Sequence, residues 1–238
     1  MNASPMRMTS SSTANTGVFW ERLWRTSGLQ FVGFFVIVSI LYGYQPQVGA
    51  SSDELLAFYN GDRTRILIAA LFAGLNLLNL LWFAAALRTT LADAGQGGWG
   101  AAATTSSAAF GALTFLQITV VAAIAYSIAG SGNYVLTSGL NDFAWALGVL
   151  ISFPRAMLIM SGVFGLWRAG LISTGLFTAG VVAVVLGVLG GTTWLSSGGF
   201  WAPDGIYSRF VSPIILLLWV LVVSRVLLSR SSATRAAW

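Results

Sequence analysis

The sequence contains no cysteine and no histidine, and all twelve of its basic residues are arginine, so it contains no lysine either. The lack of cysteine excludes disulfides, thiolate metal sites and cysteine nucleophiles. The lack of histidine excludes Ser-His-Asp triads, imidazole bases and histidine-ligated zinc or haem. The lack of lysine excludes Schiff-base and Ser-Lys chemistry. We therefore expect a protein that is not an enzyme and that holds no metal ion and no cofactor.

Charged residues are also scarce. They make up 8% of the 238 residues, whereas hydrophobic residues make up 56%. A soluble domain carries about 25% charged residues, so this composition excludes an ordinary water-facing fold. Apolar runs close to the ~20-residue length of a membrane span recur along the chain. We predict an all-α transmembrane bundle of six spans, at about 28–44, 66–87, 103–129, 141–167, 171–195 and 210–228.

The two ends of the chain are more polar than the predicted bundle, which covers 26–228. We interpret 1–25 as a disordered tail with an interfacial lead-in, and 229–238 as a second tail. A different interpretation of the first span is a signal peptide, because Val48-Gly49-Ala50 satisfies the small-residue cleavage rule. Cleavage there would leave five spans.

The arginines predict the orientation in the membrane. The net charge is +5, but the arginines lie at the ends of apolar runs, which indicates a topology signal rather than binding to nucleic acid. An even number of spans places both termini on one side. Eight arginines then share that side, namely Arg7, Arg22, Arg25, Arg88, Arg168, Arg225, Arg230 and Arg235. The other side has three, Arg63, Arg65 and Arg209. This asymmetry predicts that both termini are cytoplasmic.

The longest outer connection, 45–65, has a helix signature of its own. Ser51 and Glu54 form an S-x-x-E capping box. Apolar residues follow it at helical spacing, namely Leu55, Leu56 and Tyr59. We predict a short amphipathic helix at about 51–60 that lies on the outer leaflet, with Asp62 capping the next span. A cap over the bundle and a ligand-gating lid are the two roles considered for it.

Arg155 is the most informative residue, because it lies roughly 20 Å from either end of its span at 1.5 Å per residue. An arginine at midplane costs at least about 2.5–3.5 kcal/mol, so such residues normally face a bundle interior or a wet cavity. The preceding residue, Pro154, has no N–H and is expected to kink the helix.

Polar side chains on other spans fall at a similar depth. Asn76 and Asn79 share one face of the second span, Gln117 lies near the centre of the third, and Ser152 is close to the expected kink. We expect them to converge with Arg155 on a polar core. Three explanations remain open: the amides solvate the arginine as interhelical glue, a cavity there binds an anionic or polar ligand, or a partner subunit supplies the counter-charge.

No carboxylate shares that depth. Asp142 begins the fourth span, where we interpret it as an N-terminal helix residue favoured by the helix dipole.

Gly187 and Gly191 are expected to allow close helix packing, and Trp219 is expected to pack in the interior. Five other tryptophans predict an aromatic belt near the interfaces: Trp82, Trp145, Trp167, Trp194 and Trp201.

Two stretches carry a resemblance. They are SSDELLAFYNGDRTRILIAALFAGL at 51–75, with D-E-L-x-x-F-Y followed by R-T-R, and the G-L-W-R-A-G-L connection within 161–187. Together they cover about a fifth of the chain, and they resemble an uncharacterised family of small six-helix bacterial, often actinobacterial, integral membrane proteins. The resemblance implies a location in the bacterial inner (plasma) membrane and implies no activity.

Two functions follow from these observations. The first is a non-enzymatic membrane module that associates with protein or lipid partners in the bilayer. The alternative is a transporter or small-molecule binder with a midplane site made by Arg155, Asn76, Asn79, Gln117 and Ser152. A filled, dry core favours the first, and a cavity that reaches Arg155 favours the second. The ligand and the oligomeric state do not follow from the sequence.

Overall fold

A computed structural model describes residue 24 and residues 26–235, and the regular structure in this part of the chain is entirely helical. Six helices are long, namely α2 (Ser27–Tyr42), α4 (Arg63–Asp93), α5 (Gly97–Ala123), α6 (Tyr134–Arg168), α7 (Thr174–Gly190) and α8 (Ser212–Arg235). Short helical pieces connect them, namely α3 (Ser52–Leu56), η1 (Ala57–Gly61), η2 (Ile124–Ile128), η3 (Ala129–Ser131), η4 (Thr193–Leu195) and η5 (Tyr207–Val211). The predicted tail and lead-in at 1–25 lie outside the described residues except for Trp24.

The prediction of an all-α fold is confirmed for the described residues, and several of the helices are long and apolar enough to cross a membrane. In the described part of the chain, four helical stretches are long and apolar enough to cross a membrane, namely Arg63–Asp93, Gly97–Ser131, Tyr134–Arg168 and Tyr207–Ser229. The apolar helices α2 and α7 are shorter, with 16 and 17 residues. Each predicted span therefore coincides with one helix.

Several predicted helix ends are wrong. Helix α6 begins at Tyr134, because the side chain of Asn133 caps it by accepting a hydrogen bond from the Leu136 N–H at 3.1 Å. Asp142 therefore lies two turns inside the helix rather than at its start, and its carboxylate accepts a hydrogen bond from the Gly49 N–H at 3.3 Å. Helix α8 continues to Arg235, so most of the predicted tail at 229–238 is helical.

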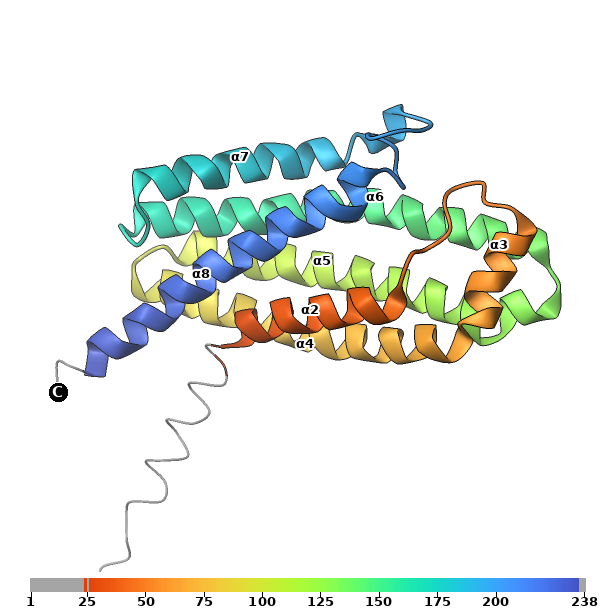
Figure 1. The fold of residues 1–238 in the computed structure, drawn as a ribbon. Helices are drawn as coiled ribbons and strands as arrows, with labels where there is room; N and C mark the ends of the chain where they lie inside the picture. Colours follow the sequence, from red (N-terminus) through yellow and green to blue (C-terminus); the bar gives the residue numbers. More distant parts are fainter. Residues whose placement is uncertain (1–23, 25, 236–238) are drawn as a thin grey trace, which may run out of the picture.

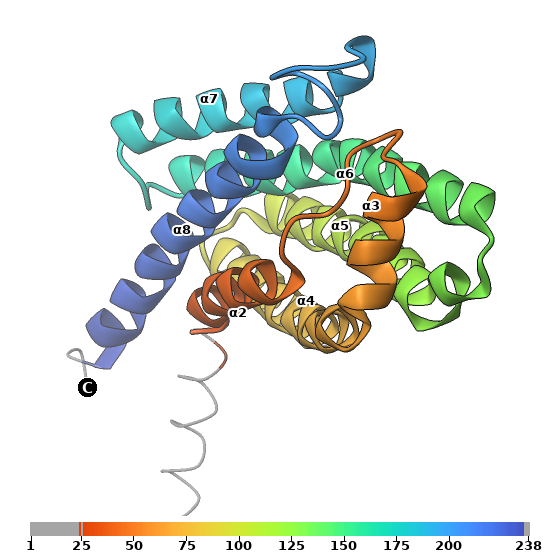
Figure 2. The same cartoon turned by 45° about the vertical axis from the view of Figure 1, so that its right-hand side comes forward.

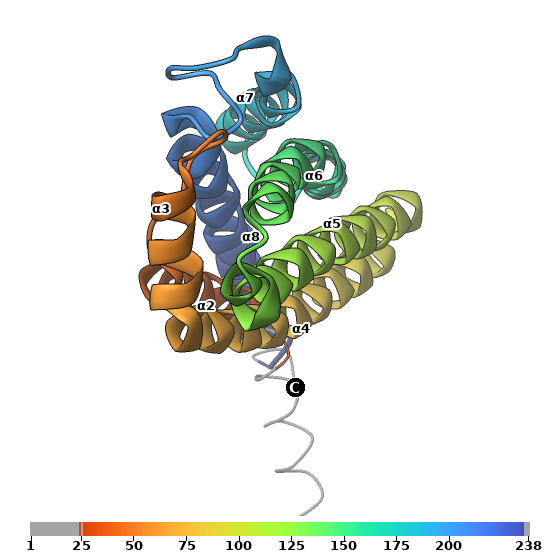
Figure 3. The same cartoon turned by 90° about the vertical axis from the view of Figure 1, so that its right-hand side faces the viewer.

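The six long helices form one bundle with two distinct ends. Helix α2 begins and α8 ends at the same end of the bundle (Figure 1), which we call the terminal end. The opposite end carries α3 and the connection before α6, and we call it the loop end. Helix α2 packs on α4, α4 on α5, α5 on α6, and α6 on α7. Figure 3 views the bundle from the loop end, with α7 above α6.

Small residues set how closely the helices approach. A Cβ atom on Gly187 would lie 3.0 Å from the Ala156 Cβ, and one on Gly191 would lie 2.3 Å from the Phe153 ring. The expected close packing at these glycines therefore occurs between α6 and α7 of one chain. At the terminal end, a Cβ on Gly28 of α2 would lie 2.1 Å from the Ser224 Oγ of α8. From this contact α2 and α8 diverge toward the loop end (Figures 1 and 2).

Two apolar clusters fill the bundle. The larger packs α4, α6 and α8 together, and in it the Trp219 ring meets the Phe83 ring edge-on at 5.7 Å, as expected of an interior tryptophan. The smaller cluster lies under α3 and η1 and includes Leu55, Tyr59 and Ile124. The space between the two clusters contains the cavities described below.

The predicted capping box is present. The Glu54 N–H donates to the Ser51 Oγ at 3.3 Å, and the Ser51 N–H donates to a Glu54 carboxylate oxygen at 3.1 Å. Leu55 and Tyr59 are buried in the smaller cluster, so this segment caps the bundle rather than lying on the leaflet. Asp62 makes no capping hydrogen bond to α4, because its carboxylate pairs with Arg65 instead.

Candidate functional site

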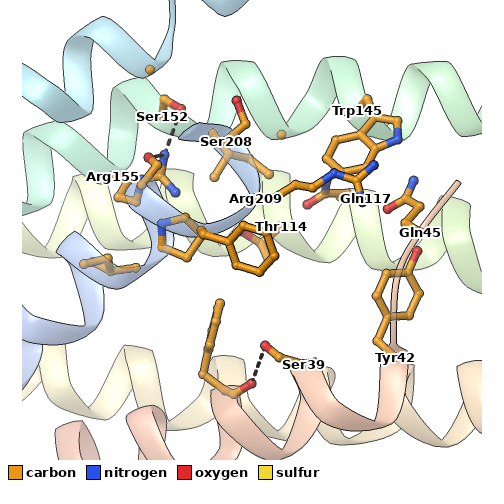
Figure 4. A pocket seen from close by; sticks show the side chains of 18 of the residues that line it. Ser39, Tyr42, Gln45, Thr114, Gln117, Trp145, Ser152, Arg155, Ser208 and Arg209 are labelled. Atoms are coloured by element: carbon orange, nitrogen blue, oxygen red, sulfur yellow. Dashed lines mark hydrogen bonds between the residues drawn. The ribbon is translucent and has the colours of Figure 1, made fainter. Parts of the chain in front are cut away.

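A cavity of about 660 Å³ lies between α2, α5, α6 and the start of α8. It extends from the level of Arg155 to the loop-end connections at Gly43 and Pro203. In Figure 4, Arg155 and Arg209 lie on the opposite side of the space from Ser39 of α2. The apolar part of its wall includes Phe35, Ile40, Phe110, Ile151, Phe210 and Leu216.

Arg155 is held at the inner end of this cavity. Its Nη2 donates to the Ser152 Oγ at 2.8 Å and to the Ser212 Oγ. Ser152 lies one turn earlier on the same face of α6, and Ser212 is the first residue of α8, so the arginine joins these two helices. Its side chain is only 8% exposed, and no carboxylate forms an ion pair with it in the described part of the chain. The guanidinium is therefore solvated by neutral groups alone.

Arg209 contributes a second cation nearer the loop end. Its Nε donates to the Asp204 carbonyl, and its guanidinium carbon lies 4.1 Å from the Tyr44 ring centroid and 4.7 Å from that of Trp145. These rings orient the cation by cation–π attraction. The Nη2 atom of Arg209 is buried and has no hydrogen-bond partner. No aspartate or glutamate is among the described residues that line the cavity.

Hydrogen bonds fix the loop-end wall of the cavity. The buried Asn141 accepts from the Tyr59 hydroxyl at 2.8 Å and from the Gln45 side chain at 3.2 Å, and it donates to the Gln47 carbonyl at 3.1 Å. Burial raises the pKa of the Tyr59 phenol, so at neutral pH it remains a hydrogen-bond donor. The chain after α2 is thereby held against α6.

The structure brings some of the predicted site residues together. Ser152 and Gln117 line the cavity with Arg155, whereas Asn76 lines a second cavity of about 260 Å³ and Asn79 lines neither. The expectation that an amide would solvate the arginine is not met by any hydrogen bond. The Gln117 amide instead donates to the Ala144 carbonyl at 2.8 Å, and serine hydroxyls take the amides' place at the guanidinium.

Three residues of the cavity wall were not expected there: Ser212, Arg209 and Trp145. The sequence suggests that Arg209 is a water-facing charge and that Trp145 belongs to the aromatic belt. Instead the Trp145 indole N–H donates to the Pro46 carbonyl at 2.8 Å, and its ring faces Arg209. Arg209 and Trp145 line the cavity because the connections 43–50 and 201–209 meet beside it. This contact joins segments far apart in the sequence, so no local sequence pattern predicts it.

Among the described residues, no group of three or more acidic side chains could hold a metal ion. Comparisons with protein-family models, with curated proteins and with solved structures give no significant match. The family resemblance therefore stays a prediction.

Proposed function

We propose that this protein is a membrane-embedded binding protein for an anionic amphipathic molecule, and that the acidic group of the ligand binds between Arg155 and Arg209. The observation that carries the proposal is a cavity of about 660 Å³ that is lined by two arginines and, among the described residues, by no carboxylate. Pockets for small ligands measure about 300–1,000 Å³. A cavity that reaches Arg155 also favours this function over the module with a filled core.

Charge supports an anionic ligand. Burying a cation away from water costs several kcal/mol, and proteins usually offset this cost with a carboxylate. Serine hydroxyls give hydrogen bonds to Arg155 but no opposite charge. A guanidinium also presents five N–H donors in a planar fork that matches a phosphate or carboxylate. An acidic ligand would supply both the missing charge and acceptors for the unpartnered Arg209 Nη2.

The walls support an amphipathic ligand. Most of the surface of the cavity wall is apolar, as in ligand pockets generally. Ile40 of α2 and Phe210 next to α8 both line the cavity and are also 73% and 47% exposed, so the cavity borders on the lateral surface where these helices diverge. A molecule with an alkyl chain can reach such a cavity from the hydrocarbon layer.

We also propose that all six long helices cross a bacterial plasma membrane, with both termini in the cytoplasm. The shorter α2 and α7 lie alongside helices of spanning length. Arg88 and Arg168 lie at or near the ends of α4 and α6 at the terminal end of the bundle, and Arg225 follows Ser224, which contacts the start of α2. Arg63 and Arg209 lie at the loop end. This distribution supports a cytoplasmic terminal end by the positive-inside rule.

The binding proposal is tested with dodecyl phosphate as the probe, using the full chain in nanodiscs of neutral phosphatidylcholine. Saturating probe is expected to raise the melting temperature, because a ligand that binds only the folded state at about 100 times its Kd stabilises it by about 2.7 kcal/mol. Dodecanol, which has the same chain but no charge, is expected to have a much smaller effect.

The matched variants are Arg155→Met and Arg63→Met. Arg63 is an exposed loop-end arginine outside the cavity, so its loss should leave the shift unchanged. Arg155→Met should abolish most of the shift. Equal stabilisation of the wild type by dodecanol, or an undiminished shift in Arg155→Met, would contradict the proposal.

A further inference from the structure

The second cavity, of about 260 Å³, lies between α2, α4 and α5. On α4 it is lined by Ala69, Ala70 and Ala73, which share the face of Asn76 at helical spacing. Three alanines in succession on that face leave room where larger side chains would fill the interior. Phe31 is among the residues of α2 that line it.

Asn76 is the distinctive residue of this cavity. Its side chain is 5% exposed, and its Oδ1 is buried with no hydrogen-bond partner. A buried amide without a partner costs about 1–3 kcal/mol, so native structures seldom leave one unpaired. The residue lines an apolar cavity, so a rotation of its terminal amide brings the unpaired oxygen to a group that enters that space.

The two cavities adjoin each other. They share seven lining residues, among them Phe35, Phe110 and Thr114. The Thr114 Oγ1 on this shared wall is also buried without a partner. The two cavities are therefore separated only by shared side chains, and an elongated molecule that moves these side chains aside can extend from the arginines to Asn76.

We propose that the second cavity receives the far end of the ligand bound at Arg155 and Arg209, and that Asn76 selects a ligand with a hydroxyl group on its apolar chain. This inference rests on the proposed function, because the arginines must hold the acidic end. The hydroxyl donates to the Asn76 Oδ1 and replaces the hydrogen bond that the folded chain leaves unmade. An unsubstituted alkyl end would keep that oxygen unpaired, and sites of this kind discriminate against such analogues.

The test compares alkyl phosphates with ω-hydroxyalkyl phosphates of the same length, from octyl to hexadecyl, by titration of the wild-type protein in phosphatidylcholine nanodiscs. We expect one chain length at which the hydroxylated probe binds about tenfold more tightly than its unsubstituted partner, the order expected for one buried hydrogen bond. This comparison uses only the wild-type protein, so it does not depend on whether a variant folds.

The matched variants are Asn76→Leu and Asn79→Leu. Asn79 lies three residues further along the same helix face, is buried as well, and lines neither cavity. Asn76→Leu should remove the advantage of the hydroxyl and keep the binding of the unsubstituted probe, whereas Asn79→Leu should keep the advantage.

The outcomes separate this inference from the proposed function. If alkyl phosphates bind in an Arg155-dependent way but no chain length gains from a hydroxyl, the inference is wrong and the proposed function stands. The same holds if the advantage survives in Asn76→Leu. If none of the phosphates binds, both are wrong.

Discussion

Arg155 shows how one residue can be placed correctly from sequence while its partners are not. Depth alone requires that a midplane arginine face the bundle interior, and its side chain is buried there. The hydrogen-bond partners of its guanidinium do not follow from the depth of the residue in the membrane. Ser152 follows from the spacing on α6, but Ser212 reaches the guanidinium only because the turn before α8 brings that helix start against α6.

The first prediction concerns the stability of the protein without ligand. Arg155→Met replaces a buried cation by an apolar side chain of similar length, and such exchanges are often neutral or stabilising by about 1–4 kcal/mol. Ser152 and Ser212 can donate to helix carbonyls when the guanidinium is gone. We expect the melting temperature in neutral nanodiscs to stay equal or rise. A strong loss of stability would mean that the arginine is structural and that its charge is compensated.

The second prediction concerns alkaline pH. Burial raises the pKa of Tyr59 above its usual value near 10, so the folded protein keeps a proton that the unfolded chain releases. The stabilising contribution is complete below about pH 10 and is lost as the pH rises above that value. The melting temperature of the wild type should therefore fall more steeply above pH 10 than that of Tyr59→Phe. Tyr134→Phe, which alters an exposed tyrosine, serves as control and should follow the wild type.

At the scale of elements, the helices follow from the sequence better than their ends do. Long apolar runs predict the six long helices, and the Ser51–Glu54 capping box predicts the start of the short helix α3. The predicted start of α6 is wrong because Asn133 caps the helix at Tyr134, and the polar residues Ser138, Asn141 and Asp142 that follow its first turn hide this start from hydropathy. Asp62 fails as a cap because Arg65, one turn away, competes for its carboxylate.

The third prediction concerns the contact between α2 and α8 at the terminal end. A Cβ on Gly28 would come within 2.1 Å of the Ser224 Oγ and 2.7 Å of the Phe83 ring, so Gly28→Val forces these side chains or the helices that carry them to move. Overpacking of this kind destabilises by about 1–3 kcal/mol. Gly33 lies on the same helix with open space around its position, so Gly33→Val is the matched control. Thermal melts should show a clear loss for Gly28→Val only, and equal loss in both would contradict the packing described here.

At the scale of the whole molecule, the cavities could not be predicted. The sequence identifies Gln117 and Asn76 as polar side chains at the right depth. That Gln117 lines both cavities and Asn76 only the smaller one depends on how far α2 stands from α8 and on the alanines of α4. Arg209 and Trp145 enter the site through long-range contacts between connections. Periodicity reports which face of a helix is polar, not the distance to the next helix.

The fourth prediction is the orientation of the bundle. Single cysteines at Gln96, in the connection between α4 and α5, and at Leu136, in the first turn of α6, lie at opposite ends. Because the chain has no native cysteine, each new thiol is the only target for an impermeant reagent. In intact cells we expect labelling at position 136 and protection at position 96. The reverse pattern would invert the topology.

The central claim, an anionic amphipathic ligand in the cavity of Arg155 and Arg209, is tested most directly by photolabelling. The probe is an alkyl phosphate with a diazirine in its chain, applied to the full-length protein in phosphatidylcholine nanodiscs, and mass spectrometry locates the modified residues. We predict labels on cavity residues such as Phe35, Phe110 and Thr114, prevented by excess dodecyl phosphate and absent in Arg155→Met. Labels confined to the exposed outer face of α7, unaffected by competitor or by the variant, would contradict the account.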